Sequence, residues 1–376
     1  MTHKLLIVTT VPVTIKAFLL PFVRHFQSLG WQVDAMAQEI SHEAECVAAC
    51  DRVWDIQWSR NVLDPRNLLS GVKRVKEVVA EGDYDLVHVH TPIAAFVTRY
   101  ALKDLDKPKV VYTAHGFHFF RGNSALKNAI FFNLEKLAGK WTDCLVTINH
   151  EDETAAKNHN FLPADRIYYT RGIGVDTNRY ASNRVSEEDV MQIRQELNLD
   201  SSDKLLLCIA EFTPRKRHQD ILNALAKLNN PQLHIALAGV GPLEEEIKQL
   251  AKNLNIDKQI HFLGFRRDIP TLIQAASAVL LVSQQEGLPR SVMEAMCLNT
   301  PVIGSNIRGT QDLLEDGCGI LVELGDTDAL AQAMAQIVED PEEAQKIAKK
   351  AKDKMVDYDI KQIIEEYTEI FDLALN

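Results

Sequence analysis

The sequence predicts an α/β protein built from two domains, each with a doubly wound parallel sheet. Short apolar runs typical of buried strands alternate with helical patterns along almost the whole chain, which is the order of a βαβ architecture. At 376 residues the chain is long for a single domain, so two are expected. An acidic, polar stretch at 181–189 separates two such series and marks the boundary between them.

The first half begins with a strand-like run at residues 4–10 and a helix at 15–29, which ends at Gly30, a residue favoured just after a helix C-terminus. Its further expected strands are 31–37, 53–58, 84–90, 109–115 and 144–149, and its further helices are 67–80, 92–103 and 124–140. Because helices separate most successive strands, the strands are expected to run parallel in one sheet.

The second half repeats the same alternation. Its expected strands are 205–212, 233–239, 260–265, 278–283, 301–305 and 319–322, with helices between them. We therefore expect one domain at 1–180, a second at 181–358, and a last helix at about 360–373.

The charge of the chain limits the class of partner. A net charge of −11 argues against general nucleic-acid binding. The charge is uneven, because residues 1–181 carry 21 basic and 20 acidic side chains, whereas residues 182–376 carry 20 and 32. The two halves are therefore expected to meet different partners.

The sequence also predicts where the protein works. No apolar run approaches the roughly 20 residues of a membrane span. The first apolar run is too short for a signal peptide. Cys144 and Cys208 fall inside apolar runs, as buried free thiols do in a reducing compartment. We expect a cytoplasmic protein.

The most informative stretch follows the apolar run at 278–283. It reads Glu286-Gly287-Leu288-Pro289-Arg290 and continues into a helix that contains Glu294, with Pro289 expected in the first helical turn. A helix N-terminus presents free N–H groups and a partial positive charge, which suit a phosphate. Two glutamates eight positions apart are more often solvated surface, but the strand–loop–helix context favours two carboxylates that face one ligand.

This arrangement resembles the Glu, seven residues, Glu signature of the retaining nucleotide-sugar glycosyltransferases of family 4. The resemblance covers essentially the whole chain, and it implies the GT-B fold, in which two Rossmann-like domains face a cleft and a final helix, here 359–376, packs back on the first domain. It implies that Glu286 contacts the donor sugar and Glu294 the ribose. The other donor contacts implied in this stretch are Gly287, Leu288, Pro289 and Arg290.

A basic loop follows the expected strand at 205–212. Arg215 and Lys216 stand among its cations, and their position at a strand end favours neutralisation of a pyrophosphate over a merely solvated turn. Lys216 matches a family lysine, implied to act in catalysis. The matching family arginine is replaced by Glu211, a departure for which Arg215 or Arg171 is a candidate substitute.

Two further strand ends complete the expected donor site. Gly239 and Gly241 form a turn where the backbone can approach a ligand closely, and they match a Gly-x-Gly-Pro turn of the family. Phe265 and Arg266 follow another strand, where the family implies that backbone groups hold the nucleotide base.

In the first half, His115 falls at the end of a strand, where a family histidine contacts the donor sugar. A metal site formed by His88, His90, His115 and His118 is a weaker interpretation, because no carboxylate or cysteine has matching spacing. The Asp-x-Asp pairs are interpreted as caps and turns: Asp83/Asp85, Asp326/Asp328 and Asp357/Asp359. We expect neither a metal nor another cofactor.

The resulting hypothesis is a retaining, metal-independent hexosyltransferase. It is expected to move a hexose or N-acetylhexosamine from a UDP-linked donor to a glycan or polyprenyl-diphosphate-linked acceptor in cell-surface polysaccharide synthesis. The segment 117–141, with six aromatic residues and a net charge of +3, is expected either to lie on anionic lipid or to be a core helix with exposed lysines. The alternatives are a nucleotide-sugar epimerase of the same fold and a non-catalytic, two-domain sugar-binding protein.

Overall fold

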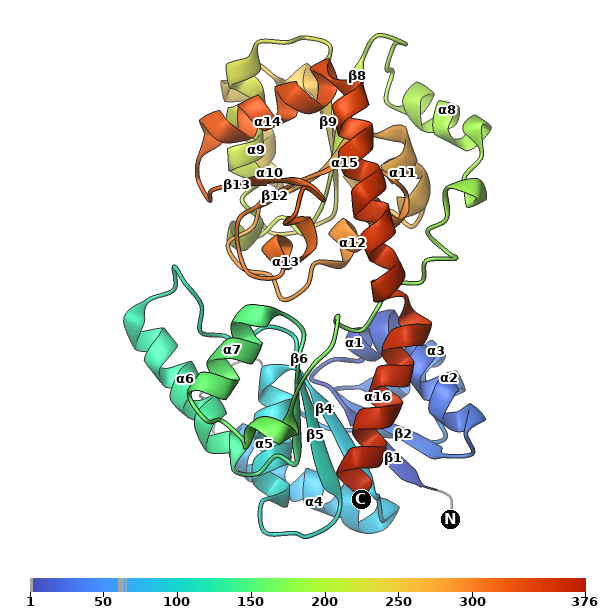
Figure 1. Cartoon of the computed structure of the whole chain (residues 1–376), viewed down its shortest axis with the longest axis vertical. Coiled ribbons are helices and arrows are strands. Elements are labelled where there is room, and N and C mark those ends of the chain that lie inside the picture. The colour runs from blue at the N-terminus through green and yellow to red at the C-terminus, as the bar shows by residue number, and fades with distance from the viewer. Residues whose placement is uncertain (1–2, 60–63, 65) are drawn as a thin grey trace. The chain divides into compact units, whose positions relative to one another are not determined.

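The structure is a computed structural model that describes residues 3–59, 64 and 66–376 (Figure 1). Positions 1, 2, 60–63 and 65 of the expected first domain lie outside the described residues. The chain forms two compact units: unit 1 contains Met1–Gly174 and Ile360–Asn376, and unit 2 contains Val175–Asp359. The sequence places the divisions after residues 180 and 358, and the structure places them after 174 and 359.

Unit 1 is built on a parallel sheet which, in the described part of the chain, has seven strands in the order β3-β2-β1-β4-β5-β6-β7. Its strands are β1 (Lys4–Val8), β2 (Gln32–Ala37), β3 (Val53–Asp55), β4 (Leu86–His90), β5 (Lys109–Ala114), β6 (Cys144–Thr147) and β7 (Ile167–Tyr169). Strands β1 and β4 are buried almost throughout, as expected for a sheet covered on both faces.

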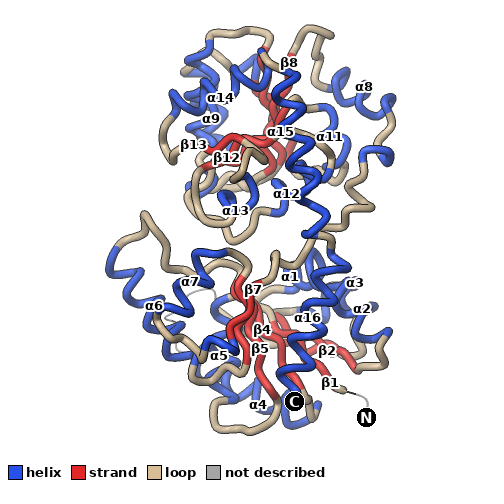
Figure 2. Tube along the Cα trace, viewed as in Figure 1, coloured by secondary structure: helices blue, strands red, loops and turns tan. Residues whose placement is uncertain are grey.

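Helices cover both faces of this sheet (Figure 2). The helices of unit 1 are α1 (Pro12–Thr14), α2 (Leu20–Ser28), α3 (Ala44–Ala49), α4 (Val72–Gly82), α5 (Pro92–Leu102), α6 (Ala125–Gly139), α7 (His150–Asn158) and α16 (Ile360–Leu375). One hydrophobic core joins the sheet to α2, α3 and α16, and a second joins it to α4, α5 and α7. The last helix of the chain is therefore an integral part of unit 1.

Unit 2 has the same architecture. Its described residues form a parallel sheet of six strands in the order β10-β9-β8-β11-β12-β13. The strands are β8 (Lys204–Ile209), β9 (Leu233–Ala238), β10 (Ile260–Gly264), β11 (Ala278–Leu281), β12 (Val302–Ser305) and β13 (Ile320–Val322).

Two cores again enclose the sheet of unit 2. The helices are α8 (Glu187–Glu196), α9 (His218–Leu228), α10 (Glu244–Asn253), α11 (Ile269–Ala275), α12 (Arg290–Cys297), α13 (Thr310–Leu314), α14 (Thr327–Glu339) and α15 (Pro341–Lys354). Helices α8, α11 and α12 contribute to one core, and α9, α10 and α14 to the other. The prediction of two doubly wound parallel sheets is confirmed.

Some local features differ from the sequence-based expectation. The helix expected at 15–29 starts as a π-helical segment, Ile15–Leu19, before α2, and the one expected at 67–80 starts as a π-helical segment, Asn67–Gly71, before α4. The edge strand β7 was not expected. It has three residues, too few for an alternating pattern to stand out.

The strand order has a direct consequence for function. In both sheets the order reverses at one point, between β1 and β4 in unit 1 and between β8 and β11 in unit 2. Loops at the carboxyl ends of the two strands diverge at such a point, and ligands of doubly wound proteins bind there.

Candidate active site

In unit 2, the reversal point is flanked by the loop 210–217 after β8 and the loop 282–289 after β11. The two loops are tied together by hydrogen bonds, because the Gln284 amide donates to the Arg215 carbonyl at 2.9 Å and the Arg215 guanidinium donates to the Gln285 carbonyl at 2.6 Å. The basic loop and the acidic loop predicted from the sequence are therefore neighbours.

The centre of this site is an ion cluster on Glu286. Its Oε1 accepts from Lys216 Nζ at 2.6 Å and from Arg215 Nη1 at 2.9 Å. The Lys216 and Glu286 side chains are only 12% and 10% exposed, which limits screening by solvent. Two cations share one carboxylate, so the cluster carries a net positive charge that suits an anionic ligand.

A third cation, Arg308, reaches the same loop from the segment after β12. Its Nε donates to the Glu286 carbonyl at 3.3 Å, and its side chain is buried. The next residue, Gly309, lies so close to Gly287 that a Cβ there would stand 2.0 Å from the Gly287 carbonyl oxygen. Arg308 was not predicted as a site residue, because the Glu286 carbonyl that it contacts lies 22 positions away in the sequence.

Glu294 lies within α12 and is 8% exposed. Its Oε1 accepts from the Tyr180 hydroxyl at 2.5 Å and from Arg290 Nε at 2.9 Å, and burial raises the pKa of its carboxyl. Both contacts use the same oxygen, so Oε2 can accept from a ligand. Tyr180 was not predicted, because it lies far from Glu294 in sequence.

The start of α12 differs from the prediction. The helix begins at Arg290, and Pro289 is its N-cap residue with an extended backbone rather than a member of the first turn. The missing N–H of proline costs nothing at either position, which is why the sequence did not distinguish them. Leu288 packs against the hydrophobic core of unit 2.

Close packing within unit 2 explains why the turn after β9 contains glycines. A Cβ at Gly239 would lie 2.0 Å from the Ala210 carbonyl oxygen, and one at Gly241 would lie 2.6 Å from the Phe212 amide nitrogen. The structure thus requires both glycines for close packing against the loop after β8, whether or not a ligand also approaches them.

Phe265 and Arg266 follow β10 and have different surroundings. Phe265 is 72% exposed at the carboxyl end of its strand. The Arg266 guanidinium forms ion pairs with Asp268 at 2.6 Å and Glu196 at 2.5 Å. Its side chain is therefore already held by protein carboxylates.

The two candidates for the missing family arginine lie in different units. Glu211 is exposed, and Arg215 on the same loop contacts Glu286. Arg171 belongs to unit 1, where its guanidinium is 4.0 Å from Glu366 on α16.

In unit 1, His115 follows β5 directly. Its Nε2 lies 2.8 Å from Nδ1 of His90, the last residue of β4, and burial lowers the pKa of His115 to about 4. At the reversal point of this sheet, the Thr10 and Thr91 hydroxyls are 2.7 Å apart. A hollow of about 460 Å³ adjoins the ends of β1 and β2, lined by Val11, Pro12, Gln38, Glu39, His42 and Glu43.

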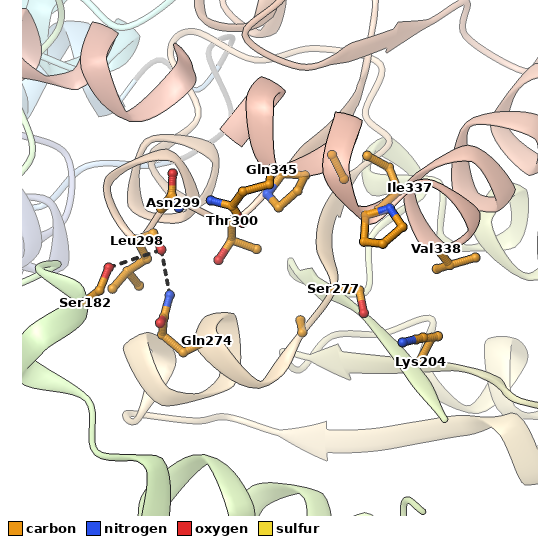
Figure 3. A pocket seen from close by; sticks show the side chains of 14 residues that line it. Ser182, Lys204, Gln274, Ser277, Leu298, Asn299, Thr300, Ile337, Val338 and Gln345 are labelled. Atoms are coloured by element: carbon orange, nitrogen blue, oxygen red, sulfur yellow. Dashed lines mark hydrogen bonds between the residues drawn. The ribbon is translucent and has the colours of Figure 1, made fainter. Parts of the chain in front are cut away.

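A further pocket, of about 440 Å³, lies at the opposite edge of the unit 2 sheet, near the amino ends of β8, β11 and β12. Figure 3 shows Ser182 and Gln274 hydrogen-bonded to Leu298 in this pocket; both side chains donate to its carbonyl. Of the described residues that line it, only Lys204 is charged. The pocket lacks the clustered cations of the ion cluster on Glu286 and is not the candidate site.

Within the described residues, no three His, Cys, Asp or Glu side chains gather as a metal site would require. Some of the Asp-x-Asp residues serve the fold. Asp83 ends α4 in a left-handed conformation, Asp85 accepts from the Lys4 amide at 2.8 Å, and Asp326 caps α14 by accepting from the Ala329 amide at 2.9 Å.

Part of the segment 117–141 packs in the core of unit 1, which is one of the two alternatives expected for it. Phe117 is buried, and the half-buried Phe119 and Phe132 pack with Phe161 against the same core. The exposed apolar side chains of α6 are instead Leu126, Ile130 and Leu137. Within the described residues, no helix is both long and apolar enough to cross a bilayer.

Comparison with known proteins places these features in context. Residues 17–179 match the family model for Glycosyltransferase Family 4, and residues 189–354 match that for Glycosyl transferases group 1. A protein of Bacillus subtilis (strain 168) that carries the name glycosyltransferase EpsD is 32% identical over 376 residues, which cover 99% of this chain and 97% of that protein.

A second relative is an Escherichia coli enzyme, UDP-Gal:alpha-D-GlcNAc-diphosphoundecaprenol alpha-1,3-galactosyltransferase. It is 27% identical over 285 residues, covering 74% of this chain and 72% of its own. Among solved structures, Anabaena Alr3699/HepE in complex with UDP and glucose matches with a TM-score of 0.83 and 22% identity, over 98% of this chain and 99% of that one. Sucrose-phosphate synthase from Thermosynechococcus elongatus matches with a TM-score of 0.82 and 20% identity, over 99% and 98%.

Proposed function

The chain belongs to the glycosyltransferases, with domains of family 4 and of group 1, and from this premise we propose that it transfers a hexose or N-acetylhexosamine from a UDP-sugar to a polyprenyl-diphosphate-linked glycan, with retention of configuration. The observation that carries the donor assignment is the cluster of Arg215 and Lys216 on Glu286 at the reversal point of unit 2. Fixed cations at such a point suit a nucleoside diphosphate. The UDP complex of the structural neighbour and the UDP-Gal donor of the Escherichia coli relative support the choice of nucleotide.

Different residues would contact different parts of the donor. Arg215, Lys216 and Arg308 would face the diphosphate and stabilise the charge that develops as it departs. Glu294, fixed by two donors on Oε1, would offer Oε2 to the ribose hydroxyls. Glu286 would contact the sugar.

The ion cluster also bears on the mechanism. A carboxylate that holds two cations through one oxygen is a weak nucleophile, because both contacts stabilise its negative charge. We therefore propose that no covalent sugar–enzyme intermediate forms on Glu286 and that the acceptor hydroxyl attacks from the face that the diphosphate leaves. The same cations take the place of a metal in this scheme, so transfer should survive EDTA, and loss of transfer that Mn²⁺ restores would contradict it.

The acceptor is assigned to unit 1. The hollow beside β1 and β2 adjoins the segment 10–14 that follows β1. The corresponding loop of the resembling family faces the acceptor and the phosphates. Helix α6 would bring this unit to the inner face of the membrane, where a polyprenyl-linked acceptor resides. The name of the Escherichia coli relative, which acts on a diphosphoundecaprenol-linked sugar, supports a lipid-linked acceptor.

The test is to incubate the purified chain with UDP-, GDP- and TDP-sugars, with and without polyprenyl-diphosphate-linked glycans, and to identify products by mass spectrometry and NMR of the anomeric proton. The expected result is an acceptor-dependent α-linked product from a UDP-sugar. Conversion of the donor to a free sugar epimer without acceptor would indicate an epimerase. Binding without turnover would contradict the proposal.

A further inference from the structure

Two hydrogen-bond donors of unit 2 hold one oxygen of Glu294. Oε1 accepts from the Tyr180 hydroxyl at 2.5 Å and from Arg290 Nε at 2.9 Å. The carboxylate is buried and lies about one turn inside α12. Burial also raises the pKa of the Tyr180 hydroxyl, so this group keeps its proton and donates it to the carboxylate. The orientation of the carboxylate is therefore set before any ligand binds.

The other oxygen of Glu294 is available to a ligand. A carboxylate oxygen has about two lone-pair sites, and Tyr180 and Arg290 use both sites of Oε1. In the part of the chain that the structure describes, Oε2 accepts no hydrogen bond, yet it is not one of the unpartnered side-chain atoms that are sealed from solvent. Oε2 thus offers two acceptor sites to a ligand.

Tyr180 is itself rigidly placed. Its side chain is buried in the hydrophobic core that also contains Met293 of α12. Its amide donates to the Asp176 carbonyl at 3.1 Å, and Asp176 Oδ1 accepts from the amides of Asn178 and Arg179 at 3.1 and 3.0 Å. Because both the turn and the ring are fixed, the hydroxyl can hold Glu294 in one orientation.

Two acceptor sites on one oxygen suit a vicinal diol. The adjacent hydroxyls of a ribose can both donate to Oε2, whereas a 2′-deoxyribose has only one of them. The deoxy compound would leave one acceptor site of a buried carboxylate unpaired, and a site built to bind a hydroxyl rejects an analogue that lacks it.

We propose that Tyr180 is a positioning residue that directs Oε2 of Glu294 toward the ribose diol, and that this pair restricts the donor to ribonucleotides. Sugars linked to thymidine diphosphate, whose pentose is 2′-deoxyribose, are then excluded as donors. This inference rests on the donor site of the proposed function, and it narrows the class of donor.

The test is isothermal titration calorimetry of the full chain with two pairs of nucleotides: UDP against 2′-deoxy-UDP, and GDP against 2′-deoxy-GDP. We expect the wild type to bind the ribonucleotide roughly 10- to 100-fold more tightly than its deoxy counterpart, the scale of one hydrogen bond to a charged group. Tyr180→Phe keeps the buried ring and removes only the hydroxyl, so the carboxylate can turn away from the diol. This variant should lower the ratio of the two affinities by roughly three- to tenfold.

The ratio separates positioning from a general structural effect, because a loosened fold weakens the binding of both nucleotides alike. The matched control is Tyr358→Phe, which removes the hydroxyl of another buried tyrosine in the same core. Its ratio should equal that of the wild type. Circular dichroism checks that both variants are folded, and the wild-type ratio tests the proposal without any substitution.

Equal affinity of the wild type for the ribonucleotide and the deoxynucleotide would overturn the proposal, and so would an unchanged or higher ratio in folded Tyr180→Phe. An equal fall in Tyr358→Phe would assign the effect to packing and would overturn it as well. Binding of GDP in place of UDP, with the expected ratios, would contradict the proposed UDP donor and support the role of Tyr180. Binding of neither ribonucleotide would overturn both.

Discussion

Lys216 Nζ lies 2.6 Å from Glu286 Oε1, and both side chains are little exposed to solvent. Each side chain therefore holds the other in place. If Lys216 faces the departing diphosphate, its loss removes a fixed charge where negative charge develops. Lys216→Ala should therefore lower the single-turnover rate by roughly 10²–10³, the usual scale for one such donor. Rapid-quench measurement with radiolabelled donor would give this rate.

The matched control for Lys216 is its neighbour Arg217. This guanidinium pairs with Asp220 at the start of α9 and not with Glu286. Arg217 has a left-handed backbone at φ 38°, so Arg217→Asn is the suitable change, because asparagine tolerates that conformation. We expect near-wild-type turnover; a loss equal to that of Lys216→Ala would indicate a general effect of charge on the loop.

Glu294 gives a prediction on binding. Glu294→Gln keeps the size of the side chain but removes the charge that the ribose hydroxyls would meet. A hydrogen bond to a charged group is worth about 1.5–3 kcal/mol, so the affinity for UDP should fall by about tenfold or more. Isothermal titration calorimetry with UDP measures it, and unchanged affinity in a folded Glu294→Gln protein would remove Glu294 from the site.

The residues that the sequence identified at this site share one property. Glu286, Glu294 and Lys216 lie in short stretches whose strand–loop–helix order is legible from the local pattern. Tyr180 and Arg308 were missed as site residues because their partners are 114 and 22 positions away, and no local pattern reports such contacts. Predicting tertiary contacts of this kind requires the order of the strands in the sheet as well as their positions in the sequence.

At the scale of elements, α6 presents cations and apolar side chains together. Its one acidic residue, Glu135, is paired with the buried Arg99 at 2.9 Å and accepts from the Tyr112 hydroxyl. Lys127, Lys136 and Lys140 remain exposed beside Leu126, Ile130 and Leu137. The surface is thus more uniformly cationic than the sequence alone indicates.

This surface predicts binding to anionic lipid. Each cation near such a membrane contributes on the order of 1 kcal/mol. Changing Lys127, Lys136 and Lys140 together to Gln should therefore weaken flotation with vesicles that contain phosphatidylglycerol, and high salt should weaken binding of the wild type. The matched control is Lys346, Lys349 and Lys350 to Gln on α15. Equal flotation of the two triple variants, or no flotation at low salt, would exclude α6 as the contact.

Sequence patterns predict the boundaries of helices and strands less well than their presence. The strand expected at 278–283 ends at Leu281, because the residues that follow leave the ladder and build the loop of the ion cluster. The π-helical segments that begin two helices were not visible in the sequence. A π-helical turn has one extra residue, and this shifts the spacing of the apolar residues by less than that spacing already varies.

At the scale of the whole molecule, the regular alternation of strands and helices was sufficient to predict two parallel sheets. A crossover helix between parallel strands must lie on one face of the sheet, so the alternation restricts the topology strongly. The position of the reversal point is not contained in that alternation. It depends on which face each helix covers, and the structure supplies it.

The last prediction concerns the pH dependence of folding. Both units bury neutral histidines: burial lowers the pKa of His88 to about 3, that of His115, His218 and His261 to about 4, and that of His90 well below 6.5. An unfolded histidine titrates near 6.5. Between pH 4 and 6.5 the unfolded chain therefore binds more protons than the folded one, so the free energy of unfolding rises with pH over this range.

Urea unfolding followed by circular dichroism at pH 5.5, 6.5, 7.5 and 8.5 would measure this dependence. The midpoint should rise from pH 5.5 to 7.5. It should fall again at pH 8.5, where unfolded thiols begin to ionise, because burial raises the pKa of the six cysteines in the folded chain. Glu294 has the opposite effect on the free energy of unfolding, because burial raises the pKa of its carboxyl. The histidines outnumber it, so their effect is expected to dominate. His261→Gln, which replaces a titrating ring in unit 2 outside the candidate site, should reduce the slope. A midpoint that rises as the pH falls from 7.5 to 5.5 would show that these histidines are not held neutral by the fold.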